Sequence, residues 1–369
     1  MKTVRRLFYR DILSSVGFVT VAFLALFFFI DFVDDLDAIG RKGRAVWHVV
    51  LSTLYEVPGH FYDLFPITVL IGTIYSLARM AQASEFTILR TGGLGPGRAL
   101  GLLASLGAAF CALNFVVGDY VAPLAERASL ALTARFDGAR AIGGAGAWLK
   151  ERLQTPEGER NISINVGGID ATGRLQNLRA FLFDTDGRLV ARMAARSADV
   201  ANDGTWTLHD LSITQWPQAR AEPSVVMQGQ LPTYTFKSSL DPGVVAAAVL
   251  PLSSMTTVEL WRYSVHLDDQ AQATQQVKIR FWKKALYPLA CLVMVALALP
   301  FAYLHARSGS VSIKVFGGIM LGIAFVLLNN LAGHVGMLRD WTPWVVAAAP
   351  SLLFLLLSMA AFTWLVRYR

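Results

Sequence analysis

Glycines crowd residues 92–98, which read Gly-Gly-Leu-Gly-Pro-Gly-Arg. A glycine-rich turn could cradle a phosphate, but a phosphate loop follows a β-strand and ends in Gly-Lys-Ser or Gly-Lys-Thr. This turn lies between apolar stretches and lacks that ending. Its glycines are typical of a helix end and a tight turn. We therefore predict that any ATP-driven step depends on an ATPase supplied by another chain.

Side chains that could catalyse hydrolysis are scattered rather than clustered. No Gly-x-Ser-x-Gly, His-Glu-x-x-His or carboxylate pair lies within an apolar stretch. The two cysteines, Cys111 and Cys291, both lie in apolar runs, as small buried hydrophobic residues do. We predict no catalytic residue, metal site or cofactor in this chain. The histidines, mostly in loops or at the ends of apolar stretches, are His48, His60, His209, His266, His305 and His334.

Residues 79–91 carry apolar side chains at helical intervals, although the segment is a short loop between two apolar stretches. One interpretation is a helix lying on the membrane surface. The other is a coupling helix seated in a groove of an ATPase, where an acidic residue would pair with a basic one. The second interpretation predicts a docking site made of Glu85, Phe86, Leu89 and Arg90.

Basic residues gather where an apolar stretch begins near residue 285. Long basic side chains at a helix end can extend towards the membrane surface without binding a ligand. They can also bind the phosphate or carboxylate of a lipid headgroup. Arg127 and Arg135, just past the third apolar stretch, could line the same entrance. The central cluster consists of Lys278, Arg280, Lys283 and Lys284.

Two adjacent amides, Asn329 and Asn330, lie in an apolar stretch that also contains Gly317, Gly318, Gly322 and Gly333. Small residues allow helices to approach closely, and amides can hydrogen-bond across the interface. Helix packing is the interpretation that the sequence favours. A role in lining a transport pathway would need a partner subunit.

Six apolar stretches must position these side chains. The chain has 369 residues, is 54% hydrophobic and has a mean hydropathy of +0.46, which indicates a membrane protein. Each stretch comes close to or exceeds the roughly 20 residues that a helix needs to cross the hydrocarbon core. The second is the weakest, because it is short and contains Asp63 and Pro66. The stretches are 12–30, 61–78, 99–117, 285–304, 315–338 and 343–366.

Basic residues fix the expected orientation, because short basic loops stay in the cytoplasm. The amino terminus and the loops 79–98 and 305–314 are rich in lysine and arginine, whereas the loop after residue 30 is acidic. We expect both termini in the cytoplasm and an uncleaved first helix in the inner membrane. The net charge of +7 is largely explained by these basic loops, so it gives little reason to expect nucleic-acid binding.

The polar block from Leu124 to Gln276 divides the six stretches three and three. It alternates short apolar runs with turn signals, the pattern of an all-β domain, and Asn202-Asp203-Gly204 predicts a hairpin. A change of side-chain phase after Leu208 indicates a β-bulge. Thr256 and Glu259 predict a capped helix at its end. A sandwich, a jellyroll and an open barrel all fit. The expected parts are membrane helices at 1–123 and 277–369 around a periplasmic domain at 124–276.

Three stretches resemble one known family. They are Phe32-Val33-Asp34-Asp35-Leu36 after the first span, Ala81 to Gly93 in the cytoplasmic loop, and Trp282-Lys283 through Pro288-Leu289 to Phe301. Together they are similar to the lipopolysaccharide export permeases LptF and LptG, the LptG branch in particular. The resemblance covers the whole chain.

This resemblance implies a membrane α-helical fold with six transmembrane helices and an inserted periplasmic β-jellyroll. It implies a heterodimer with an LptF-like permease, a dimeric LptB-like ATPase that binds ATP and Mg, an LptC-like membrane-anchored protein and an LptA-like periplasmic bridge. The cavity between the two permeases would take lipopolysaccharide from the outer leaflet of the inner membrane. The first and fifth spans would form its gate walls.

One feature departs from the family. Familiar LptG sequences have lysine in and after the first span, whereas this chain has Asp31 and Asp37, with its basic residues displaced into the following loop. We expect either that the displaced residues and the cluster at 278–284 bind the headgroup, or that the glycolipid has a different charge. The displaced residues are Arg41, Lys42 and Arg44. A non-catalytic scaffold and another type of exporter permease are the alternatives.

Overall fold

Six helices in the described part of the chain are long and apolar enough to cross a membrane, which confirms the predicted spans. The third joins a helix, a π-helical turn and a second helix, and the fourth joins two helices through a short 3₁₀ turn. In order they are α1 (Lys2–Asp34), α2 (Val46–Gln82), α4 (Pro96–Val116) with η3 (Val117–Val121) and α5 (Ala122–Asp137), α8 (Gln275–Leu286) with η5 (Tyr287–Leu289) and α9 (Ala290–Tyr303), α10 (Val311–Leu338), and α11 (Pro343–Arg367).

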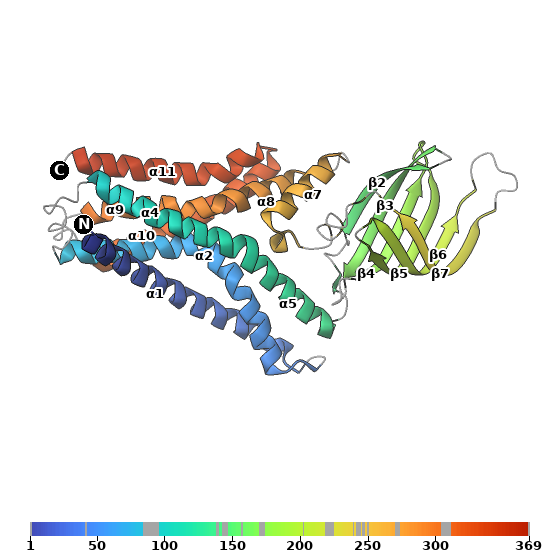
Figure 1. Cartoon of the computed structure of the whole chain (residues 1–369), viewed down its shortest axis with the longest axis horizontal. Coiled ribbons are helices and arrows are strands. Elements are labelled where there is room, and N and C mark those ends of the chain that lie inside the picture. Colours follow the sequence, from blue (N-terminus) through green and yellow to red (C-terminus); the bar gives the residue numbers. More distant parts are fainter. Residues whose placement is uncertain are drawn as a thin grey trace. The chain divides into compact units, whose positions relative to one another are not determined.

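The computed structural model forms two compact units, one helical and one dominated by a sheet (Figure 1). The helical unit contains Met1–Asp37, Val49–Glu126 and Lys278–Arg369, and the sheet unit contains Ala38–His48 and Arg127–Val277. The described residues are 2–40, 43–83, 96–137, 140–141, 147–155, 158–169, 174–201, 203–217, 225–238, 240, 245, 248, 251–269, 274–303 and 311–367.

Helix α2 is much longer than the sequence predicted. It begins at Val46 rather than near residue 61, and it continues through Pro58 and Pro66. Its amino-terminal half carries Glu56, His60 and Asp63, so a search for stretches without charged residues places the start of the helix too late. Each proline removes one helical hydrogen bond, yet α2 continues through both, with Pro66 in its buried part.

The core of the helical unit joins residues from all six spans. Glycines allow close approaches between the helices. A Cβ atom at Gly72 of α2 would lie 2.6 Å from the Val16 Cα of α1, and Cβ atoms at Gly318 and Gly322 of α10 would meet Ile74 and Ile67. The predicted role of the small residues of α10 in helix packing is thereby confirmed.

The inserted domain is a single antiparallel sheet in which successive strands pair from β3 to β7, while β1 and β2 both pair with β3. Apolar residues of one face form its core, with Trp206 and Ile164 fully buried. The predicted all-β insert is confirmed. The strands are β1 (Arg140–Ala141), β2 (Ala147–Thr155), β3 (Gly158–Ile169), β4 (Leu175–Phe183), β5 (Leu189–Val200), β6 (Thr205–Gln215) and β7 (Met227–Lys237).

The predicted hairpin joins β5 to β6. The Ala201 amide donates to the Thr205 carbonyl at 2.9 Å, and the Gly204 amide donates to the Ala201 carbonyl at 3.0 Å. Gly204 has a φ of +80°, which glycine adopts at little cost. The Asp203 carboxylate accepts a hydrogen bond from the Thr205 amide at 3.0 Å and fixes the turn.

The predicted change of side-chain phase in β6 is confirmed. It is not confined to a bulge in β6, because neighbouring strands change phase in the same row. Strand register places Gly167, Asn177, Arg196, Asp210 and Pro232 side by side, in one row across β3 to β7. Asn177 and Asp210 have φ values of 52° and 51°, in the left-handed region. We call this row the crease.

Three strands change side-chain phase at the crease. On β4 the buried positions are Leu175 and then Leu178, and on β6 they are Leu208 and then Leu211. β5 shows the same three-residue step, from Ala195 to Ala198. Because the strands change together, their register is unaltered across the crease and one apolar face is kept.

Candidate functional site

The basic cluster lies on α8, as the sequence suggested. Arg280 is exposed, whereas Lys278, Lys283 and Lys284 are partly buried. The side chains therefore differ in what they can bind from outside the protein. Arg280 is the most accessible of the four to a headgroup.

Two tyrosines fix the position of α8 and η5 against α2. The Tyr62 hydroxyl donates to the Lys284 carbonyl at 3.3 Å, and the Tyr287 hydroxyl donates to the Asp63 carbonyl at 2.5 Å. Their rings lie 5.1 Å apart. A Cβ at Gly118 in η3 would collide with the Tyr62 ring, so the absence of a side chain there makes room for it.

Lys283 points into the helix bundle rather than outward. Its ammonium group donates to the main-chain carbonyl of Asn329 on α10 at 2.7 Å. A Cβ at Gly333 would lie only 2.4 Å from the Lys283 Nζ, so that glycine forms the notch that receives the ammonium. Lys283 thus links the fourth span to the fifth.

The two asparagines of α10 face different surroundings. Asn329 is partly buried and Asn330 is exposed. The Asn330 main-chain carbonyl accepts a hydrogen bond from His334 Nδ1 at 3.0 Å. A pathway role for the two amide side chains stays a prediction.

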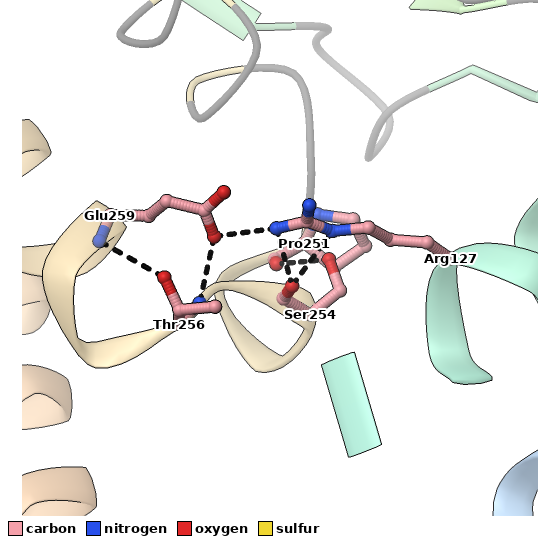
Figure 2. A network of polar contacts seen from close by, with 5 residues as sticks. All are labelled: Arg127, Pro251, Ser254, Thr256 and Glu259. Atoms are coloured by element: carbon pink, nitrogen blue, oxygen red, sulfur yellow. Dashed lines mark hydrogen bonds and ion pairs between the residues drawn. The ribbon is translucent and has the colours of Figure 1, made fainter. Parts of the chain in front are cut away.

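Arg127 belongs to a polar network that also starts α7 (Thr257–Asp269) (Figure 2). Its guanidinium donates to the Ser254 carbonyl at 3.1 Å and to the Glu259 carboxylate at 2.5 Å. The predicted capping box is present: Glu259 accepts from the Thr256 amide at 2.8 Å, and Thr256 Oγ1 accepts from the Glu259 amide at 3.2 Å. In this arrangement Arg127 orders α7.

The network sets the charge of Glu259. Burial alone would raise the pKa of its carboxyl group, but the Thr256 amide and the Arg127 guanidinium outweigh burial and lower that pKa below its ordinary value. Glu259 is therefore ionised at neutral pH. The ion pair with Arg127 is fully formed there.

The remaining predicted headgroup residues lie apart from α8 in the sequence. Arg44 stacks over the Phe136 ring at 5.6 Å, and His48 contacts the same ring edge-on at 4.6 Å. The side chain of Arg135, and Arg41 and Lys42 entirely, lie outside the described residues. The proposed docking residues Glu85, Phe86, Leu89 and Arg90 also lie outside them.

Three potential metal ligands meet where α1 and α2 run together. Atoms of Asp31, Glu56 and His60 all lie within 4.8 Å of one another. His60 Nε2 is 2.7 Å from Asp31 Oδ2, and the Phe27 ring packs against the imidazole at 5.1 Å. These residue types could hold a divalent cation, and the same geometry also describes a hydrogen-bonded ion pair. The four-residue spacing of Glu56 and His60 was the available sequence signal.

A family model described as lipopolysaccharide export system permease LptF/LptG matches residues 6–366. The chain belongs to this family. A relative named lipopolysaccharide export system permease protein LptG, from Haemophilus influenzae, is 23% identical over 364 residues, which is 97% of each chain. The protein of the same name from Escherichia coli K12 is 22% identical over 351 residues, or 95% of each chain.

The match to the LptF/LptG family covers both sets of three helices and the sheet domain between them. It identifies the chain as a lipopolysaccharide export permease, a multi-pass protein of the inner membrane.

Proposed function

We propose that this permease is the LptG-type subunit of an ATP-driven exporter that removes lipopolysaccharide from the outer leaflet of the inner membrane. It would pair with an LptF-like permease and deliver the lipid through LptC-like and LptA-like proteins. The family match over residues 6–366 carries the proposal. The relatives named LptG support this branch over LptF.

ATP and Mg would bind to a dimeric LptB-like partner. The docking site that we propose lies within residues 79–91, because apolar residues recur there at helical intervals. Residues 84–91 of this site belong to the segment 84–95 between α2 and α4. The charge of the loops supports cytoplasmic termini and a sheet domain in the periplasm. In that orientation the segment faces the ATPase and the α8 cluster faces the periplasmic side.

The proposed headgroup site centres on α8, with Arg280 as the first residue to test. Arg280 is exposed, whereas the ammonium of Lys283 is bound to α10. A guanidinium suits the phosphates of a lipopolysaccharide headgroup because it can donate two parallel hydrogen bonds. Lys278 and Lys284 would add positive charge to the same helix.

Co-purification from native membranes tests the proposal. The tagged chain should bring down a second six-span permease and an ATPase, and mass spectrometry should find lipopolysaccharide in the complex. Reconstituted into liposomes, the complex should release lipid only when ATP is hydrolysed. Recovery of the chain without an ATPase in a mild detergent would favour a scaffold and contradict the proposal.

A further inference from the structure

The amino-terminal part of α1 contacts both helices that flank the segment 84–95. On the α2 side, Ser76 donates to the Asp11 carboxylate at 2.5 Å, and Arg79 forms an ion pair with the same carboxylate. On the α4 side, the Tyr9 hydroxyl lies 2.5 Å from Ser105 Oγ and 3.3 Å from the Leu102 carbonyl oxygen. One turn of α1 therefore bonds to α2, which precedes the segment, and to α4, which follows it.

The contact with α2 is the stronger of the two. The Asp11 side chain is only 17% exposed and Ser76 is fully buried. A carboxylate that is largely removed from water depends on charge-assisted hydrogen bonds, and the loss of one partner leaves its charge poorly compensated. Sliding α1 along α2 would break both bonds at once.

The same two helices, α1 and α2, remain in contact beyond Asp11, and we call the contacting length the matched stretch. Thr20 Oγ1 lies 2.8 Å from Thr68 Oγ1, and both threonines are buried. Gly72 brings the backbone of α2 against Val16, and Asp31 pairs with His60 farther along. From Asp11 to Asp31 the matched stretch covers about 30 Å at 1.5 Å per residue, which is close to the thickness of the hydrocarbon core.

We propose that Tyr9 and Asp11 are positioning residues that couple the segment 84–95 to α1, and that α1 and α2 move as one body. A displacement of the segment pulls on Ser76 and Arg79, and the matched stretch carries it along α1 to the end that bears Asp31. The inference rests on the proposed function, in which an ATPase docks on that segment.

Reconstituted complexes with Asp11→Asn or Tyr9→Phe test the proposal. Lipid release per ATP hydrolysed should fall about fivefold or more for Asp11→Asn, the lower end of a typical coupling energy, and by less for Tyr9→Phe. ATP hydrolysis should continue, because neither residue lies in the docking segment. Ser14→Ala is the matched control, since the exposed Ser14 hydroxyl donates to the Asp11 carbonyl of its own helix and, among the described residues, to no other helix.

Charge exchange separates coupling from folding. Asp11→Arg and Arg79→Asp should each lower release per ATP, and the double exchange should restore it at equal amounts of assembled complex. Unchanged release per ATP in Asp11→Asn would overturn the proposal. So would loss of the ATPase subunit from that variant in proportion to its lost release, since the residue would then serve assembly alone.

A cross-link provides a test that does not weaken the helices. In a background without Cys111 and Cys291, Thr20→Cys with Thr68→Cys should form a disulfide that leaves transport intact, because the helices keep their register throughout. Transport blocked by oxidation and recovered on reduction would show relative motion and overturn the proposal. Failure of the proposed function is distinct: the unmodified complex would then release no lipid with ATP.

Discussion

The ammonium group of Lys283 lies 2.7 Å from the main-chain carbonyl oxygen of Asn329, in a notch that Gly333 leaves open. This bond joins the fourth span to the fifth. Among the basic residues of α8, Lys283 is therefore engaged in helix packing.

Gly333→Ala should displace the Lys283 ammonium, because the new methyl group would lie 2.4 Å from it. The flexible lysine can swing away, so the cost should be the lost bond, about 0.5–2 kcal/mol as for other polar contacts between membrane helices. Lys283→Met should cost the same, and the double variant no more than either. Thermal unfolding of the purified complex is measured for the two single variants and the double variant. Additive losses in the double variant would refute the proposal that both changes remove the same hydrogen bond.

Arg280→Glu should weaken lipopolysaccharide binding several-fold at low salt, and the difference should shrink as salt is added. Arg6→Glu, an exposed charge reversal at the amino-terminal end of α1, is the control. Binding of labelled lipid to the complex in nanodiscs is the measurement. Equal affinities of Arg280→Glu and the unmodified protein would remove this residue from the headgroup site.

Ionised Glu259 should make folding of the sheet unit sensitive to acid. Its pKa is lower in the folded protein than in the unfolded chain, so its stabilising effect is complete above the ordinary glutamate pKa of about 4.3 and is lost as the pH falls through the lowered value. Glu259→Gln should therefore lower stability at pH 7 and flatten its acid dependence. Thermal unfolding from pH 3 to pH 7 provides the test, and parallel curves for the two proteins would contradict it.

Asn177→Gly should be tolerated and Asn177→Val should destabilise the sheet. Valine at a φ of 52° costs about 1–2 kcal/mol, because its Cβ approaches the carbonyl oxygen, whereas glycine adopts that conformation freely. Arg179→Val, at an exposed position of the same strand outside the left-handed region, controls for placing a valine on the exposed face. Urea unfolding is followed by tryptophan fluorescence, to which buried Trp206 contributes, and compared between the variants. A neutral Asn177→Val would show that the crease relaxes without cost.

Much of the architecture follows from local pattern alone. Apolar length predicts the six spans, Asn202-Asp203-Gly204 predicts a hairpin, and Thr256 with Glu259 predicts the start of α7. The bounds of α2 do not follow, because its helical outer part carries charges that tertiary contacts accommodate. The roles of Asp11 and Lys283 were also inaccessible, since each depends on a partner from another helix. The sequence marks Asp11 only as an acidic residue among basic ones.

The crease limits how the sheet domain can change in length. Phase changes in β4, β5 and β6 are aligned at Asn177, Arg196 and Asp210, so a strand cannot gain or lose a residue near the row without losing this alignment. Inserting one residue in a single strand would turn its apolar side chains to the opposite face beyond that point. Variation in length should therefore be confined to the turns between strands, and the strands themselves could lengthen only at their outer ends.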